Sequence, residues 1–182
     1  MSSAQVSRLT IRDSDDADVE AIARIYGHWV QHGLASFELT PPGADEIRRR
    51  RSAILADRYP YVVAVGEDGR VLGYGYAGPY RTRPAYRFAC EDSVYVAPDA
   101  ARDGIGRSLL QTLILRCEAS GLRLMVAIIG DSGNEPSIGL HRALGFAHAG
   151  VLPAIGWKHG RWVDTVLMVR ALGEGASTPP VV

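Results

Sequence analysis

The chain of 182 residues has little cysteine, no net charge and no long apolar run. Its two cysteines, Cys90 and Cys117, are too few for a disulfide framework and are typical of reduced thiols in the cytosol. Twenty basic residues balance twenty acidic ones, so the overall field does not steer the protein toward nucleic acid or acidic membrane. No apolar run approaches the roughly 20 residues that span a bilayer, and the first residues lack the pattern of a signal peptide. We therefore expect a cytoplasmic protein without nucleic-acid or membrane partners, which must meet any anionic ligand with local charge.

The apolar residues follow periods that predict alternating strands and helices. A hydrophobic content of 47% is enough for one continuous core, and the length falls in the range of a single domain. Gly and Pro separate the periodic segments. The predicted strands are 6–12, 61–65, 71–76, 88–96, 122–129, 146–152 and 162–169. The predicted helices end at residue 33, span 44–56, run from 104 to 121 and span 134–144.

This order of elements predicts an α/β (α+β) fold with a mixed sheet and helices on its faces, not a doubly wound Rossmann order. The segment 122–129 is almost entirely apolar, which is typical of a central strand covered on both faces. Asp68-Gly69 is a strong signal for a tight hairpin. The residues after 172 are rich in Gly, Ser and Pro. We therefore expect one domain over 1–172 and a disordered tail over 173–182.

A Gly-rich turn between a predicted strand and a predicted helix is the most informative segment. Its sequence is Ala101-Arg102-Asp103-Gly104-Ile105-Gly106-Arg107. The two glycines let backbone N–H groups surround a diphosphate, and the following helix start presents the positive end of its dipole. A bare Gly-x-Gly is equally compatible with an ordinary turn. The strand before it and the helix after it favour an anion site, to which Arg102 and Arg107 add charge.

These residues resemble the GNAT acetyltransferases, whose pyrophosphate loop is Gln/Arg-x-x-Gly-x-Gly/Ala at the same junction. The likeness runs from about residue 9 to 172. Within that superfamily, the segments 80–86, 91–96 and 158–160 are similar to phosphinothricin and methionine sulfoximine N-acetyltransferases. One departure is Ala101, which stands where the loop usually has Gln or Arg. The resemblance implies a GNAT-type mixed, mostly antiparallel central sheet with helices on both faces, acetyl-CoA as cosubstrate, and a homodimer.

Glu91 matches the family's glutamate before Ser/Thr-Val-Tyr, which implies a general base. An ammonium with a pKa of roughly 8 is mostly protonated at pH 7, so a base must accept a proton before the amine attacks. Without the resemblance, a strand glutamate that faces solvent or pairs with an arginine is the more common case. Asp92 should point to the opposite face of the same strand.

The resemblance also implies which residues hold the cofactor and a second catalytic group, His141. An imidazole can donate or accept a proton near neutral pH, although a histidine packed on the inner face of its helix is equally compatible with the sequence. Asn134 is at least a helix cap. The implied cofactor contacts are Val94, Tyr95, Val96, Arg102, Asp103, Gly104, Ile105, Gly106, Arg107, Asn134 and Ser137.

The acceptor amine is implied to bind beside an arginine-rich loop. Arginine forks suit the carboxylate of an amino acid and the oxygens of a phosphinate or sulfoximine, although exposed loop arginines are usually just solvated. The implied acceptor contacts are Phe37, Arg81, Thr82, Arg83, Glu91, Asp92 and Ser93. The hypothesis is an acetyl-CoA-dependent N-acetyltransferase for a small amino-acid-like amine, working by direct transfer in a ternary complex.

Other functions compete with this one. The acceptor could be a peptide N-terminus, a polyamine or another amine, and a CoA-binding module without turnover is a further alternative. The histidines lack metal-ligand spacing, so we expect no metal. Cys90 beside Glu91 has no histidine pairing that indicates a covalent mechanism. The Gly-x-x-x-x-Gly-Lys-Ser/Thr pattern of a nucleotide-binding P-loop is absent from the sequence.

Overall fold

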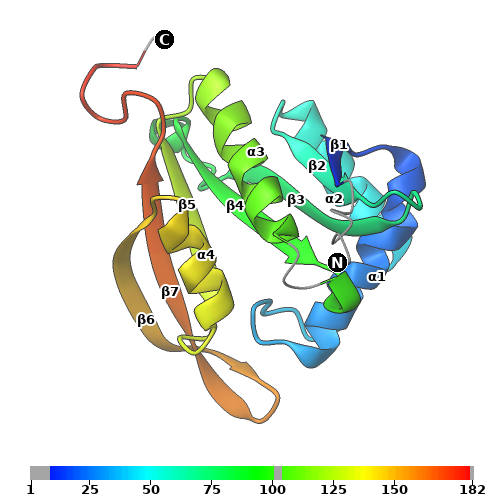
Figure 1. Ribbon diagram of the computed structural model, residues 1–182. Coiled ribbons are helices and arrows are strands. Elements are labelled where there is room, and N and C mark those ends of the chain that lie inside the picture. The colour runs from blue at the N-terminus through cyan, green and yellow to red at the C-terminus, as the bar shows by residue number, and fades with distance from the viewer. Residues whose placement is uncertain (1–8, 101–103, 181–182) are drawn as a thin grey trace, which may run out of the picture.

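The computed structural model describes residues 9–100 and 104–180 and is built on one seven-stranded sheet (Figure 1). The strand order is β1-β2-β3-β4-β5-β7-β6, and every neighbouring pair is antiparallel except β4 and β5. The expected mixed, mostly antiparallel sheet is therefore confirmed. The strands are β1 (Thr10–Asp13), β2 (Tyr61–Val65), β3 (Val71–Pro79), β4 (Ala89–Val96), β5 (Leu124–Gly130), β6 (Ala147–Lys158) and β7 (Arg161–Ala171).

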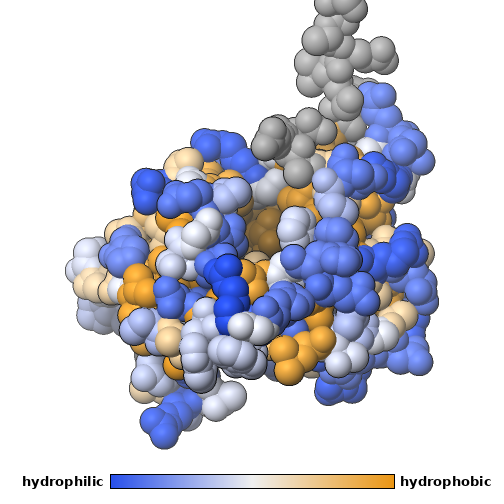
Figure 2. Space-filling model, turned by 90° about the horizontal axis from the view of Figure 1, so that it is seen from below, coloured by the Kyte–Doolittle hydropathy of each residue, from blue (hydrophilic) through white to orange (hydrophobic). Residues whose placement is uncertain are grey.

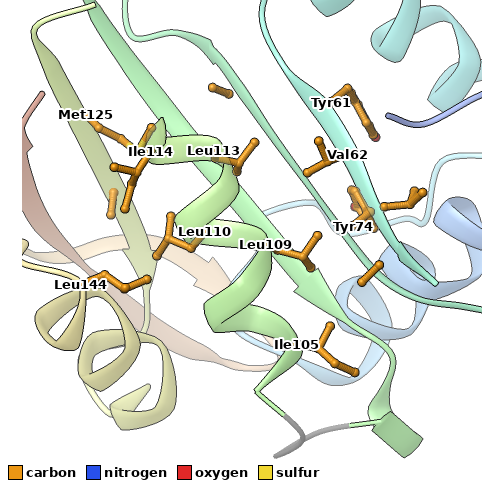
Figure 3. Close-up of a cluster of buried hydrophobic side chains, with 14 of the residues drawn as sticks. Tyr61, Val62, Tyr74, Ile105, Leu109, Leu110, Leu113, Ile114, Met125 and Leu144 are labelled. Atoms are coloured by element: carbon orange, nitrogen blue, oxygen red, sulfur yellow. The ribbon is translucent and has the colours of Figure 1, made fainter. Parts of the chain in front are cut away.

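Helices cover both faces of the sheet (Figure 1). Helices α1 and α2 pack on the face that carries Tyr74, while α3 packs on the face that carries Gly73 and Gly75. Those glycines leave room for the apolar side chains of α3, which form much of the core (Figure 3). The helices are α1 (Val19–His32), α2 (Ala44–Ala56), α3 (Ile105–Ala119) and α4 (Glu135–Ala143), with short 3-10 turns at Asp16–Asp18, Pro84–Tyr86 and Pro98–Ala100.

Strands β4 and β5 separate toward one end of the sheet. Their parallel pairing runs from Ala89 opposite Leu124 to Asp92 opposite Ala127. Beyond that point β4 still pairs with β3, and β5 still pairs with β7 through Gly130. A gap therefore opens between the two central strands. The start of α3 and the start of α4 lie at this same end of the molecule (Figure 1).

The observed elements differ from the predicted ones mainly in strand length. The first predicted strand began at residue 6, and its residues 6–8 lie outside the described part of the chain. Strand β3 continues to Pro79 instead of ending at residue 76. The last hairpin reaches Lys158 and resumes at Arg161, where the prediction stopped at 152 and resumed at 162. The strand continues past Pro153, because a register shift between Leu152 and Gly156 accommodates the proline.

The tail after Leu172 lies beside Arg123, which donates hydrogen bonds to the carbonyl of Gly175 and to Thr178. The predicted disorder of this tail stays a prediction. No helix within residues 9–100 and 104–180 is both long and apolar enough to cross a membrane.

Candidate active site

A pocket of about 60 Å³ fills the gap between β4 and β5. Strand β4 contributes Asp92 to Tyr95 to its wall, and β5 contributes Ala127 to Gly130. Backbone groups that leave a sheet ladder need other partners, so this gap offers unpaired main-chain donors and acceptors to an extended ligand. Trp29 of α1 already takes one of them, because its Nε1 donates to the Val96 carbonyl at 2.8 Å. The other residues of the lining are Ala35, Asn134, Ser137 and His141.

The start of α3 lies next to this pocket and is open to an anion. Gly104 has a φ of 75°, which only glycine adopts freely, and no side chain caps the helix there. A Cβ on Gly104 would meet nothing within 4 Å, and one on Gly106 would first meet Leu140 of α4 at 3.4 Å. The first N–H groups of α3 can therefore bind phosphate oxygens. Arg102 and Asp103, predicted to take part, lie outside the described residues.

Helix α4 brings three predicted residues to the pocket. The side chain of Asn134 accepts a hydrogen bond from the Ser137 N–H at 3.3 Å and so caps the helix. Both residues line the pocket. One turn later, His141 is 4% exposed and points its ring toward β4.

Both ring nitrogens of His141 have partners. Nδ1 lies 2.7 Å from the Ser137 carbonyl, to which it must donate, and Nε2 lies 3.1 Å from Oδ2 of Asp92. Burial lowers the pKa of His141, but the hydrogen bond and charge of Asp92 and the Ser137 carbonyl more than offset this, so its pKa is raised. The two side chains therefore form a buried hydrogen-bonded pair, which favours the protonated form of the imidazole.

Asp92 keeps one oxygen free for another partner. Its Oδ1 is buried and receives no hydrogen bond from residues 9–100 or 104–180. A buried carboxylate oxygen without a donor is costly, and this residue lines the pocket. A ligand with an N–H group fits that acceptor, so the residues present are compatible with the amide-bearing arm of coenzyme A.

Glu91 lies on the opposite face of β4, as the alternation of a strand requires. It is half-buried, and burial together with the charge of Asp92 raises its pKa, while Arg81 partly opposes this. A carboxylate with a raised pKa is a better proton acceptor near neutral pH. Its charge also reaches Tyr76 and Tyr95, both on this face. Glu91 and His141 therefore do not lie side by side: each faces a different side of the strand.

Of the predicted acceptor residues outside β4, Arg81 is the one whose charge reaches Glu91. Arg81 lies within electrostatic range of Glu91, and its guanidinium stacks 4.7 Å from the centre of the Tyr80 ring. Thr82 and Arg83 follow in the same exposed turn. Asp92, in contrast, points to the other face of β4, toward His141, so its side chain does not share a face with Glu91.

Phe37 belongs to a loop over residues 33–40 that crosses the end of the sheet. Ala35 of this loop lines the pocket between β4 and β5. On its other side, Phe37 and Leu39 border an open groove of about 390 Å³ with Ile155 and Trp157. Figure 2 views this end of the molecule, where apolar side chains lie exposed among polar ones.

Cys90 does not take part in this arrangement. It is buried against Cys117 of α3, and the hydrogen bond between the two thiols, together with burial, raises its pKa well above the usual range. A thiol held protonated is a poor nucleophile. Among the described residues, no three His, Cys, Asp or Glu side chains are grouped so as to hold a metal ion.

Comparison with known proteins agrees with this geometry. The sequence profile described as the acetyltransferase (GNAT) family matches residues 27–146, which include β4, the start of α3 and α4. The chain belongs to the GNAT acetyltransferase family. The resemblance stated from the sequence is thereby confirmed.

Relatives of this GNAT chain have named activities. It is 54% identical over 171 residues to a phosphinothricin N-acetyltransferase of Alcaligenes faecalis, covering 94% of this chain and 86% of that protein. It is 41% identical over 170 residues to an L-methionine sulfoximine/L-methionine sulfone acetyltransferase of Pseudomonas paraeruginosa, covering 93% and 98%. A phosphinothricin acetyltransferase of Sinorhizobium meliloti, solved in complex with acetyl-CoA, superposes with a TM-score of 0.93 at 49% identity, covering 95% and 93%.

Sequence reasoning missed the contacts that join distant segments. Asp92 and His141 are 49 positions apart, and no local pattern pairs them. The sequence likewise did not predict the hydrogen bonds that Tyr26 and Lys158 make to the 33–40 loop. A usable signal existed for Lys158, because it is the only lysine in a chain that otherwise uses arginine.

Proposed function

We propose that this protein transfers the acetyl group of acetyl-CoA to the amine of a small amino-acid-like acceptor of the phosphinothricin or methionine sulfoximine and sulfone type. The observation that carries the proposal is the pocket between β4 and β5, with a free helix start at one end and a carboxylate of raised pKa across the strand. The activities named for the relatives support the same substrate class.

The cosubstrate side of the site binds and orients acetyl-CoA. In this proposal, the N–H groups at Gly104, Ile105, Gly106 and Arg107 hold the diphosphate, aided by Arg102. The exposed edges of Val94, Tyr95 and Val96, with Asn134 and Ser137, hold the pantetheine arm. Acetyl-CoA supplies an acetyl thioester, whose carbonyl becomes more electrophilic when backbone N–H groups polarise it.

The acceptor side of the site controls a proton. Arg81, with Thr82 and Arg83, binds the acceptor's carboxylate through charge-assisted hydrogen bonds. Glu91, directly or through a water, accepts a proton from the ammonium, and the amine nitrogen then bonds to the acetyl carbon as the carbon–sulfur bond breaks. The thiolate that leaves takes a proton from water on the cofactor side. There we assign to His141 the supply of positive charge beside the leaving sulfur, since both its N–H groups are already engaged.

The assembly and the location are part of the proposal. We propose a single acetyltransferase domain over residues 1–172 that works in the cytoplasm as a homodimer. Strand β6 is a sheet edge, and nine of its twelve residues are exposed. Long exposed edges invite pairing with another chain. Large exposed apolar side chains gather on this hairpin, namely Val151, Leu152, Ile155, Trp157 and Trp162.

A panel of amines tests the substrate class. Release of free coenzyme A thiol from acetyl-CoA should be fast with phosphinothricin, methionine sulfoximine and methionine sulfone, and slow with the same amines lacking the carboxylate. Substituting Arg81 and Arg83 together by Ala should raise the acceptor KM about 10-fold or more and leave the acetyl-CoA KM unchanged. Arg87→Ala, which removes an arginine stacked on Phe88 in the same stretch, is the matched control.

The panel also separates the competing functions. Equal turnover of polyamines or neutral amines would show that the acceptor is not amino-acid-like. Tight binding of acetyl-CoA with no thiol release for any amine would indicate a binding module.

A further inference from the structure

Lys158 is an unusual residue in both sequence and structure. It is the only lysine among the 182 residues, and the other 19 residues of the Lys+Arg total of 20 are arginines. It is also the one buried residue of β6, a strand otherwise exposed or half-exposed along its whole length. At 2% exposure it is the least exposed charged residue in the described part of the chain.

The ammonium of Lys158 reaches across to a loop 122 positions away. Its Nζ donates to the main-chain carbonyl of Ser36 at 2.6 Å. Taking an ammonium out of water is unfavourable unless a partner compensates, and burial accordingly lowers the pKa of Lys158, while the charge of Glu38 opposes the shift. A main-chain carbonyl is a partner that depends on the path of the loop and not on its side chains.

The same loop is fastened to α1 and α2. The Tyr26 hydroxyl lies 2.9 Å from Ser36 Oγ and 2.9 Å from Glu38 Oε1. Arg50 of α2 forms an ion pair with Glu38 from the other side. Lys158 therefore provides the link from the loop to β6, while Tyr26 and Arg50 provide the links to the helices.

Two glycines let the loop lie directly on the strands. A Cβ on Gly130, at the end of β5, would stand 2.4 Å from the Leu34 carbonyl oxygen. A Cβ on Gly156 of β6 would stand 2.0 Å from the Phe37 ring. The loop is thus in close contact with both strands on either side of the Ser36 carbonyl, so its path is set at that point.

The loop borders both halves of the site. Ala35 lines the pocket between β4 and β5. The charge of Glu38 contributes to the raised pKa of Tyr76 and of Tyr95, and the charge of Glu91 acts on the same two tyrosines. A displacement of the loop would therefore move groups on the acceptor face more than it would disturb the start of α3, which lies on other elements.

We propose that Lys158 is a positioning residue for the acceptor, which acts by binding the Ser36 carbonyl and holding the 33–40 loop closed against β6 beside the Glu91 face of the site. The proposal rests on the proposed function, because it assumes that the acceptor binds at Glu91. It assigns a role to a residue that touches neither substrate.

Kinetics of two variants test the role. Lys158→Met keeps an apolar stem of similar length and removes the donor, so the acceptor KM should rise about 10-fold or more while the acetyl-CoA dissociation constant stays within about twofold. Lys158→Arg should restore part of the acceptor KM, because a guanidinium can donate to the same carbonyl. Arg161→Met removes an exposed cation from the same hairpin and should change neither constant.

Amine labelling measures how well the loop protects Lys158, and it does not depend on enzyme activity. With one lysine in the sequence, a limiting dose of an amine-reactive ester followed by peptide mass spectrometry reads the label on the Lys158 peptide separately from that on the N-terminal amine. In the native wild-type protein Lys158 should react at least about 100-fold more slowly than in the urea-unfolded chain, and saturating acceptor should slow it further than the same concentration of an amine that is not an acceptor, which consumes the reagent equally. This measurement stands even where Lys158→Met fails to fold.

The outcomes separate this inference from the proposed function. An unchanged acceptor KM in Lys158→Met, an equal loss of acetyl-CoA affinity, or fast native labelling would overturn the role of Lys158. Slow labelling that no acceptor alters would overturn it too. If the wild type acetylates none of the amines, the proposed function fails, and the labelling rate still decides whether Lys158 holds the loop.

Discussion

Neighbouring side chains of β4 meet different surroundings, because they alternate across the sheet. Glu91 faces the tyrosines beneath α1 and α2, where burial raises its pKa. Asp92 faces α4 and pairs with His141. Two adjacent carboxylates thus have different surroundings: in the proposed mechanism Glu91 accepts a proton, whereas Asp92 is hydrogen-bonded to His141 on the other face of the strand.

The pH dependence of the Glu91→Gln variant tests this division. The ionised carboxylate is the form that accepts a proton, so wild-type activity is lost as pH falls through the raised pKa of Glu91. Glu91→Gln should lower kcat by roughly 10²- to 10⁴-fold near pH 7 and leave acetyl-CoA affinity unchanged. The remaining rate of Glu91→Gln should rise with pH, because the acceptor's ammonium group, with a pKa of roughly 8, loses its proton to solvent.

Glu20→Gln, at an exposed position of α1, is the control for this measurement. Full activity and an unaltered pH profile in Glu91→Gln would show that another group, or solvent alone, removes the proton.

At the scale of elements, the gap between β4 and β5 and the start of α3 form one binding surface. The gap exists because the parallel pairing stops at Asp92 while each strand keeps its outer neighbour. Helix α3 begins beside it without a side-chain cap, at a glycine with positive φ. Free N–H groups of the strand edge and of the helix start are therefore presented to one extended ligand.

Substitutions at Gly106 test this surface. Gly106→Glu would bring a negative charge to the first turn of α3, against both the helix dipole and a bound diphosphate. Calorimetry should show acetyl-CoA affinity reduced about 10-fold or more relative to Gly106→Gln, which has the same size without the charge. Gly106→Ala should bind nearly as wild type, since its Cβ would make ordinary contacts with Leu140 at 3.4 Å and Val96 at 3.6 Å. Equal affinities of the Glu and Gln variants would mean that no phosphate binds there.

Local signals account for what the sequence predicted at this scale. Helix α2 spans Ala44–Ala56 as predicted, because Pro41-Pro42-Gly43 precedes it and the hairpin strand follows. Gly33 past the end of α1 and Asn134 before α4 likewise predicted where these helices end and begin. The bulge that prolongs β6 past Pro153 was not, since tolerance of proline depends on an unpaired edge. The Asp92–His141 pair and the Ser36–Lys158 link depend on tertiary packing, which no local window contains.

The whole molecule presents one long unpaired edge. Strand β6 ends the sheet and exposes large apolar side chains along the last hairpin, whereas β1 at the other edge has only four residues. A short edge offers little to pair with, but a long apolar one favours association with a second copy.

Ile155→Glu should dissociate the proposed dimer, because a carboxylate buried in an apolar interface loses its hydration. Analytical ultracentrifugation should show the dimer mass for wild type and the monomer mass for this variant. Leu115→Glu is the matched control, since Leu115 on α3 and Ile155 are both 58% exposed. A wild-type protein that sediments as a monomer at micromolar concentration would refute the dimer.

The burial of Lys158 and the use of arginine elsewhere also affect whether acetyl-CoA can acetylate the protein itself. An acetyl thioester can acylate an unprotonated lysine amine that it meets, whereas guanidinium groups stay protonated and unreactive. Here the one lysine is 2% exposed with its ammonium bound to a carbonyl. The side chains that give this protein its positive charge are therefore almost all inert to acetylation, so repeated turnover should not erode that charge through self-modification.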